Sequence, residues 1–185
     1  AKGGIGLTMF GGSSNVAPDS PSVFRQIYMG NDGIIPYLQR FSDRIHAQGA
    51  KIQPQLVHPG PDGLAPYLSG IPNVGPSVIQ SYLTGVACRE LAEAEIEGII
   101  AQYASAAKRV REGGYDGIEL HAAHGYMLLG SFLSPVRNRR TDTYAGGDPE
   151  EKGVLGAPDG IDQIPGIPHQ RAVVHGGGDG HQGDR

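Results

Sequence analysis

The fold is decided by the stretch Gly114-Tyr-Asp-Gly-Ile-Glu-Leu-His-Ala-Ala-His-Gly-Tyr126. Its first half predicts a strand over Tyr115–His121, because an apolar run begins directly after two helix-ending glycines. Its second half supplies polar and aromatic side chains at the point where that strand ends. In parallel α/β folds the carboxyl ends of the strands share one face, and that face carries the functional site.

Predicted strands and helices alternate along the first 147 residues. In chain order the sequence predicts a strand over Ile5–Phe10 that stops at Gly11 and Gly12, a helix over 34–45 followed by Gly49, a strand over Lys51–Val57, a long helix over Leu91–Glu112, the strand over Tyr115–His121 and a short helix over Tyr126–Leu133. This alternation indicates right-handed crossovers and a parallel sheet. Pro54 lies within the second strand and counts against a central position for it.

Two polar segments interrupt this alternation. His58–Arg89 is rich in proline and glycine, and a loop of this length in a compact domain is usually either functional or disordered. Asn138–Gly147 mixes cations, an acid and an aromatic residue. We expect pairing between arginine and aspartate to hold this second loop, so that it braces the active-site face.

Three side chains after the last predicted strand carry the candidate chemistry. His121 and His124 are spaced so that both imidazoles can donate hydrogen bonds to one substrate oxygen, which would polarise a carbonyl or nitro group during reduction. Tyr126 could give a proton to the carbon that is reduced. Two alternatives stay open: one histidine caps the loop while the other packs, or the imidazoles bind a metal. No carboxylate stands at a recognisable ligand spacing, so we expect no metal site.

The ends of the two earlier strands could accommodate a flat ring. Gln55 offers both a donor and an acceptor, which suits the pyrimidine edge of a flavin. The simpler alternative is a polar group that is satisfied near the mouth of the sheet. Gly11 and Gly12 would let a ring approach the backbone closely, although most glycine pairs are simply turns.

Composition excludes several classes of function. The 185 residues carry a net charge of −4, and the pI is near 5.9, so no basic stripe is available for nucleic acid. No apolar run is long enough to span a bilayer. Cys88 is the single cysteine, which rules out an internal disulfide and favours a reducing compartment, so we expect a cytoplasmic protein. The sequence starts at Ala1 rather than Met, which predicts further residues upstream.

Taken together, these segments resemble the old yellow enzyme family of FMN-dependent oxidoreductases, which includes ene-reductases, xenobiotic reductases and the barrel domain of 2,4-dienoyl-CoA reductase. The resemblance covers about residues 1–147. It rests on residues 114–126, on their continuation as Phe-Leu-Ser-Pro135 and Asn-Arg-Arg-Thr-Asp-Thr-Tyr144, on Gln-Leu-Val-His-Pro-Gly60 and on Lys-Gly-Gly-Ile-Gly-Leu7. The His-His pair, in place of His-Asn, is more similar to the xenobiotic-reductase and dienoyl-CoA-reductase branches.

The resemblance implies a TIM barrel that holds FMN at the carboxyl ends of its strands, with about three of the eight strands in this sequence. NADH or NADPH would reduce the flavin, and a small electrophilic substrate with an activated C=C bond would then take hydride from it. Gln55 would contact the flavin ring and Gly12 would lie against it. His121 and His124 would bind the electron-withdrawing oxygen of the substrate, and Tyr126 would be the proton donor.

The sequence also departs from the family pattern. The arginine that follows Gln-Leu-x-His-x-Gly in the family is replaced by Pro61, and the Tyr-Gly-Gly motif has one extra residue in Tyr144-Ala-Gly-Gly147. We interpret 148–185 as a Gly-rich tail outside the family, either disordered or produced by a shifted reading frame. Two alternatives to the reductase stay open: an inactive fragment without bound flavin, and a metal-dependent barrel hydrolase that uses a histidine cluster (His58, His121 and His124).

Overall fold

The computed structural model of the chain describes residues 1–18, 21 and 26–146. Their elements are β1 (Leu7–Asn15), β2 (Ile27–Tyr28), the 3-10 helix η1 (Asp32–Ile34), α1 (Ile35–His46), β3 (Lys51–Val57), the 3-10 helix η2 (Gly60–Asp62), α2 (Ala65–Leu68), β4 (Val74–Gly75), β5 (Arg89–Glu90), α3 (Glu93–Glu112), β6 (Glu119–Leu120) and α4 (Met127–Leu133). The tail expected at 148–185 lies outside the described residues.

A four-stranded parallel sheet forms the centre of the fold, in the order β2-β1-β3-β6. β3 pairs with β1 over most of its length and with β6 at Gln55 and Leu56. The predicted alternating α/β architecture is confirmed, and the structure adds the two-residue strand β2 to the three strands that the sequence predicts.

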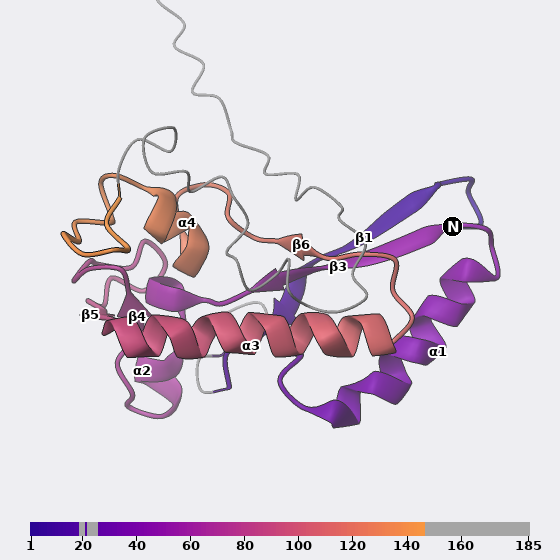
Figure 1. Cartoon of the computed structure of the whole chain (residues 1–185), viewed down its shortest axis with the longest axis horizontal. Helices are drawn as coiled ribbons and strands as arrows, with labels where there is room; N and C mark the ends of the chain where they lie inside the picture. The colour runs from indigo at the N-terminus through magenta and orange to yellow at the C-terminus, as the bar shows by residue number, and fades with distance from the viewer. Residues whose placement is uncertain (19–20, 22–25, 147–185) are drawn as a thin grey trace, which may run out of the picture.

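Helices cover one face of this sheet. Figure 1 shows α1 and α3 on the same side of β1, β3 and β6, with α4 near the end at which β3 finishes. Alternate residues of β3 face these helices, so that Ile52 and Leu56 are buried while Lys51 is exposed. The predicted apolar stripe of α3 is confirmed, with Ile100 partly buried and the other members buried: Ile96, Ile99, Tyr103, Ala107 and Val110.

Two predicted strand boundaries are wrong. β1 does not stop at Gly11, because an irregularity between Phe10 and Ser14 accommodates the two glycines and pairing with β3 resumes at Ser14. The strand predicted over 115–121 is regular only at β6. The reason lies at Asp116, whose Oδ2 accepts the Ile52 N–H that a longer β6 would use.

β3 is a central strand in spite of Pro54, contrary to the expectation from sequence. The Ile52 and Leu56 carbonyls of β3 accept hydrogen bonds from Asp116 and His121, on the β6 side. By alternation, the position of the missing Pro54 N–H is on this side too. It lies ahead of the two residues that pair with β6, so no ladder hydrogen bond is lost there.

The two polar segments, 58–89 and the loop that begins at Asn138, both have defined structure near the carboxyl ends of the strands. The segment 58–89 contains η2, α2 and β4, and β4 pairs with β5, so the predicted long loop carries short elements of its own. In the second segment Arg140 Nε donates to Asp142 Oδ1 at 2.9 Å, and Arg140 Nη1 donates to the Leu91 carbonyl at 2.6 Å. The predicted arginine–aspartate pairing is confirmed, and it ties this loop to the start of α3.

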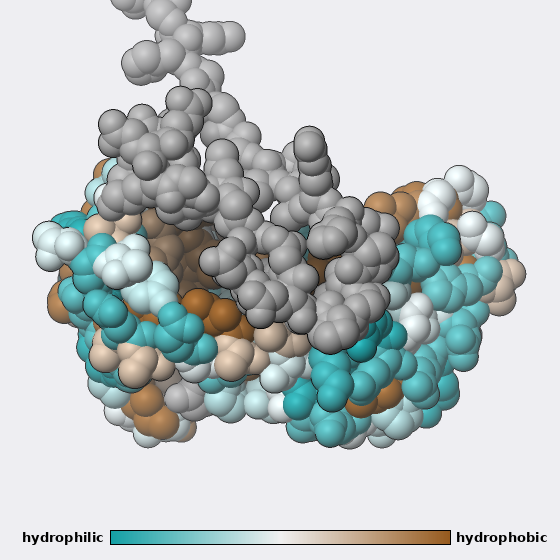
Figure 2. Space-filling view, in the orientation of Figure 1, coloured by the Kyte–Doolittle hydropathy of each residue, from teal (hydrophilic) through white to brown (hydrophobic). Residues whose placement is uncertain are grey.

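Among the described residues, no helix combines enough length with enough apolar character to cross a bilayer. Figure 2 shows apolar residues gathered around α4, whereas hydrophilic residues dominate over α1. The apolar region therefore lies at the end of the sheet where the strands finish.

Candidate active site

The turn between β6 and α4 brings the three predicted side chains together. His121 Nε2 lies 3.1 Å from Tyr126 Oη. The ring centroids are 5.3 Å apart for His121 and Tyr126, 5.9 Å for His124 and Tyr126, and 6.3 Å for the two histidines. One small substrate group could therefore touch all three rings, and the roles of these side chains stay predictions.

The backbone of this turn is strained. His124 and Met127 both have left-handed conformations, with φ of 64° and 54°. Such conformations cost on the order of 1–3 kcal/mol each in residues with a side chain, and they persist only where neighbouring contacts hold them. The turn therefore depends on support from outside its own sequence.

Burial changes the proton affinity of two of the three groups. Desolvation lowers the pKa of His121, the nearby His124 lowers it further, and Glu119 opposes both. Desolvation also raises the pKa of Tyr126, and the negative charge of Asp62 adds to this. At neutral pH the structure therefore favours an uncharged His121 beside a protonated Tyr126.

A second polar cluster lies on β3 and β6, next to these rings. Gln55 Nε2 donates to Glu119 Oε1 at 2.9 Å. Gly12 lies in the irregular part of β1, at the level of Gln55 in the neighbouring strand. Sequence reasoning missed Glu119, although strand alternation places it on the same face as His121, two residues later.

The second cluster fits the edge of a flavin ring. The Glu119 Oε2 atom is buried and has no hydrogen-bond partner among the described residues. A buried acceptor of this kind needs a donor. The pyrimidine edge of a flavin offers both donors and acceptors, which Glu119 and the Gln55 amide can match.

His58 does not join the other two histidines. It is buried, its Nδ1 accepts the Gly60 N–H at 2.9 Å, and burial lowers its pKa to about 4. Within the described ranges, no three His, Cys, Asp or Glu side chains are grouped so that they could hold a metal ion. The metal-dependent hydrolase therefore lacks the ligand set that it requires in this part of the chain.

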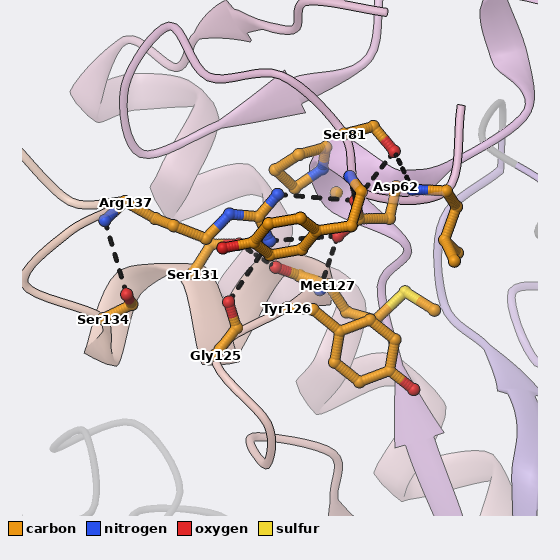
Figure 3. A network of polar contacts seen from close by, with 12 residues as sticks. Asp62, Ser81, Gly125, Tyr126, Met127, Ser131, Ser134 and Arg137 are labelled. Carbon is orange, nitrogen blue, oxygen red and sulfur yellow. Dashed lines mark hydrogen bonds and ion pairs between the residues drawn. The ribbon is translucent and has the colours of Figure 1, made fainter. Parts of the chain in front are cut away.

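The rings of His121, His124 and Tyr126 form a ring cluster, and sequence reasoning missed a buried ion pair behind it. Arg137 Nη1 lies 3.1 Å from Asp62 Oδ2, and the two side chains are 3% and 0% exposed. Figure 3 shows this pair beside the main chain of Gly125, Tyr126 and Met127, with the Tyr126 ring directed away from it. The partners are 75 residues apart in the chain, so no local pattern links them.

Residues 1–153 match the family described as the NADH:flavin oxidoreductase / NADH oxidase family. The chain belongs to this family. Its members use FMN with NADH or NADPH. Their fold is a TIM barrel, and the parallel sheet and helices described above form a part of it. The resemblance found in the sequence is thereby confirmed.

Individual relatives agree with this assignment. The chain is 47% identical over 146 residues to the multifunctional alkene reductase/demethylase OYE of Caballeronia cordobensis. This alignment covers 79% of this chain and 21% of the relative. It is 38% identical over 146 residues to the NADPH dehydrogenase of Listeria monocytogenes, and this alignment covers 79% of this chain and 41% of the relative. Among solved structures, morphinone reductase in complex with tetrahydroNAD matches with a TM-score of 0.67 and 28% identity, over 76% of this chain and 43% of that one. The chain thus spans about a fifth to two fifths of the proteins that it matches.

Proposed function

We propose that this protein acts in the FMN-dependent reduction of activated C=C bonds, or of related electrophilic acceptors, with hydride that derives from NADH or NADPH. The observation that carries the proposal is the contact of His121, His124 and Tyr126 at the end of β6. Its substrate is a small molecule that carries an electron-withdrawing oxygen next to the double bond.

The chain's own residues would hold the cofactor along the ends of two strands. The Gln55 amide and the Glu119 carboxylate would contact the polar edge of the ring, and the backbone at Gly12 would lie against its face. FMN, when bound, supplies the hydride that adds to one carbon of the double bond. The residues of the β6–α4 turn then have two tasks, which are to polarise the substrate and to supply a proton.

The histidines perform the first task. As hydride adds to the carbon remote from the carbonyl, negative charge develops on the carbonyl oxygen. N–H groups of His121 and His124 would donate hydrogen bonds to that oxygen, and such bonds are strongest when the charge has formed. The lowered pKa of His121 keeps it neutral, so it contributes a hydrogen bond without becoming a competing acid.

Tyr126 performs the second task. The carbon next to the carbonyl needs one proton to complete the reduction, so that one hydride and one proton are added in total. The raised pKa of Tyr126 keeps its hydroxyl protonated at neutral pH, and the phenolate left after transfer regains a proton from water. The proposed assignment therefore gives each polar group of the turn one step of the reaction.

The experiment compares Tyr126→Phe with the parent, both loaded with FMN and reduced by NADPH. We expect the rate of 2-cyclohexenone reduction to fall by about 10²–10⁴-fold, while reduction of the flavin by NADPH stays at the parental rate. Tyr37→Phe is the matched control, because Tyr37 is 63% exposed on α1. A Tyr126→Phe protein that reduces the enone as fast as the parent would refute the role of Tyr126. A chain that takes up no FMN would favour the inactive fragment.

A further inference from the structure

We propose that the buried Asp62–Arg137 ion pair is a clamp that positions Tyr126 by holding the two peptide groups on either side of it. Asp62 comes from η2, whereas Arg137 follows α4. Neither residue belongs to the ring cluster, so both are positioning residues. The proposal rests on the proposed function only for what the positioned phenol does.

Each member of the pair holds one of the peptide groups. Arg137 Nη1 donates to the Gly125 carbonyl at 3.3 Å, and this carbonyl belongs to the peptide bond before Tyr126. The Met127 N–H donates to Asp62 Oδ2 at 2.9 Å, and this N–H belongs to the peptide bond after Tyr126. One ion pair therefore fixes both ends of the residue that must present its hydroxyl (Figure 3).

The Asp62 carboxylate is held in one orientation. Besides Arg137 and the Met127 N–H, it accepts hydrogen bonds from the Ser81 hydroxyl at 2.8 Å and the Tyr82 N–H at 3.2 Å. Ser81 and Tyr82 belong to the ordered 58–89 segment. The position of the carboxylate beside Met127 is thus set by a segment outside the turn.

The Arg137 guanidinium is held equally well. It donates to Ser131 Oγ at 3.0 Å and to the Gln80 carbonyl at 3.4 Å, and it lies 4.6 Å from the centroid of the Tyr82 ring. A buried ion pair is weak evidence for stability, because the cost of desolvation often cancels the attraction. A pair whose partners are fully hydrogen-bonded does, however, fix a single geometry.

The clamp also accounts for the strained turn. Met127 has φ of 54° and is buried, and its N–H reaches the Asp62 carboxylate in this conformation. Loss of the clamp would let Met127 relax to an ordinary φ, and this rotation would move the Tyr126 ring away from His121. The hydrogen bond between Tyr126 and His121 is thus the quantity that reports on the clamp.

The test uses the whole 185-residue chain labelled with ¹⁵N. Two quantities are measured by NMR: the exchange rate of the Met127 amide proton and the chemical shift of His121 Nε2. In Arg137→Met we expect Met127 exchange to rise at least tenfold relative to the parent, and the His121 shift to move to its value in Tyr126→Phe. Arg139→Met is the matched control, because Arg139 is an exposed cation two residues away, and it should keep both parental values.

The amides of α3 separate local loosening from global unfolding, because any rise in their exchange rate reports the loss of global stability and should be smaller than the rise at Met127. If Arg137→Met does not fold, the same two quantities are measured in Arg137→Lys, because lysine keeps the charge and presents fewer donors. In this variant, Met127 exchange and the His121 shift should change in the same directions but by less. The proposal is overturned if the folded variant keeps the parental Met127 exchange rate and His121 shift. Neither measurement needs FMN or substrate, so a chain that fails the flavin test can still pass this one.

Discussion

Gly60 is the position at which one added methyl group should damage the site most directly. It has φ of 55°, and a Cβ atom there would lie 2.7 Å from the Leu128 Cα and 2.8 Å from the Leu128 nitrogen. These are backbone atoms of α4, so they cannot rotate away as the end of a side chain can. The change Gly60→Ala must therefore shift either η2 or the start of α4, which directly follows Tyr126.

The loss of stability has two parts. An alanine in a left-handed conformation costs roughly 1–2 kcal/mol. Displacement of packed neighbours by an added methyl group costs about 1–3 kcal/mol. We therefore expect the free energy of unfolding to fall by about 2–5 kcal/mol in Gly60→Ala. Gly49→Ala is the matched control, because Gly49 has φ of 75° and nothing within 4 Å of the added Cβ, so only the first part applies.

The assay is equilibrium unfolding in urea, followed by the far-ultraviolet circular dichroism of the helices. Thermal unfolding gives a second value, since each kcal/mol shifts Tm by about 2–4 °C in a chain of this size. The difference between the two alanine variants isolates the contact with Leu128. If Gly60→Ala is destabilised no more than Gly49→Ala, the packing of η2 against α4 is not as described.

Two further predictions concern charged groups. Arg137→Met should lower the free energy of unfolding by about 3–5 kcal/mol, because it leaves the Asp62 carboxylate buried without its cation. The double variant with Asp62→Asn should lose less than the sum of the two single losses, by about 0.5–3 kcal/mol in a double-mutant cycle, and additive losses would show that the two side chains do not interact. Desolvation raises the pKa of Asp116, but hydrogen bonds from Lys51, His46 and the Ile52 N–H outweigh it and lower the pKa to about 2. Because the folded pKa lies below the ordinary value, this stabilisation is complete above about pH 4 and is lost as the pH falls to 2. The difference in unfolding free energy between the parent and Asp116→Asn should shrink by about 1–2 kcal/mol over that range, and a constant difference in an acid titration would contradict it.

The elements that sequence predicts well are those with a strong local pattern. The helix α3 follows from a long apolar stripe and from glycines at its end, and the structure buries that stripe. The ring cluster also follows from sequence, because His121, His124 and Tyr126 stand within six positions of one another at a strand end. In both cases the information lies within one continuous stretch of the chain.

The features that sequence misses depend on partners far along the chain. β1 continues through Gly11 because it pairs with β3 again from Ser14 onward. β6 is short because the Asp116 carboxylate accepts the Ile52 N–H of β3, which a longer β6 would use. Asp62 stands in a segment rich in proline and glycine, and it belongs to no motif that would single it out. Its role depends on donors from three other parts of the chain, which only the folded structure brings together.

The departure at Pro61 shows why a site should be judged in space. The resemblance to the family implies an arginine at this position, so comparison of the sequences alone would count the proline as the loss of a cation. In the structure, the next residue, Asp62, is paired with the guanidinium of Arg137. A buried carboxylate requires a cation and hydrogen-bond donors, whichever element supplies them. The Asp62 carboxylate that holds the Met127 N–H therefore has a cation, and we expect substitutions at Arg137 to lower the free energy of unfolding more than substitutions at Pro61.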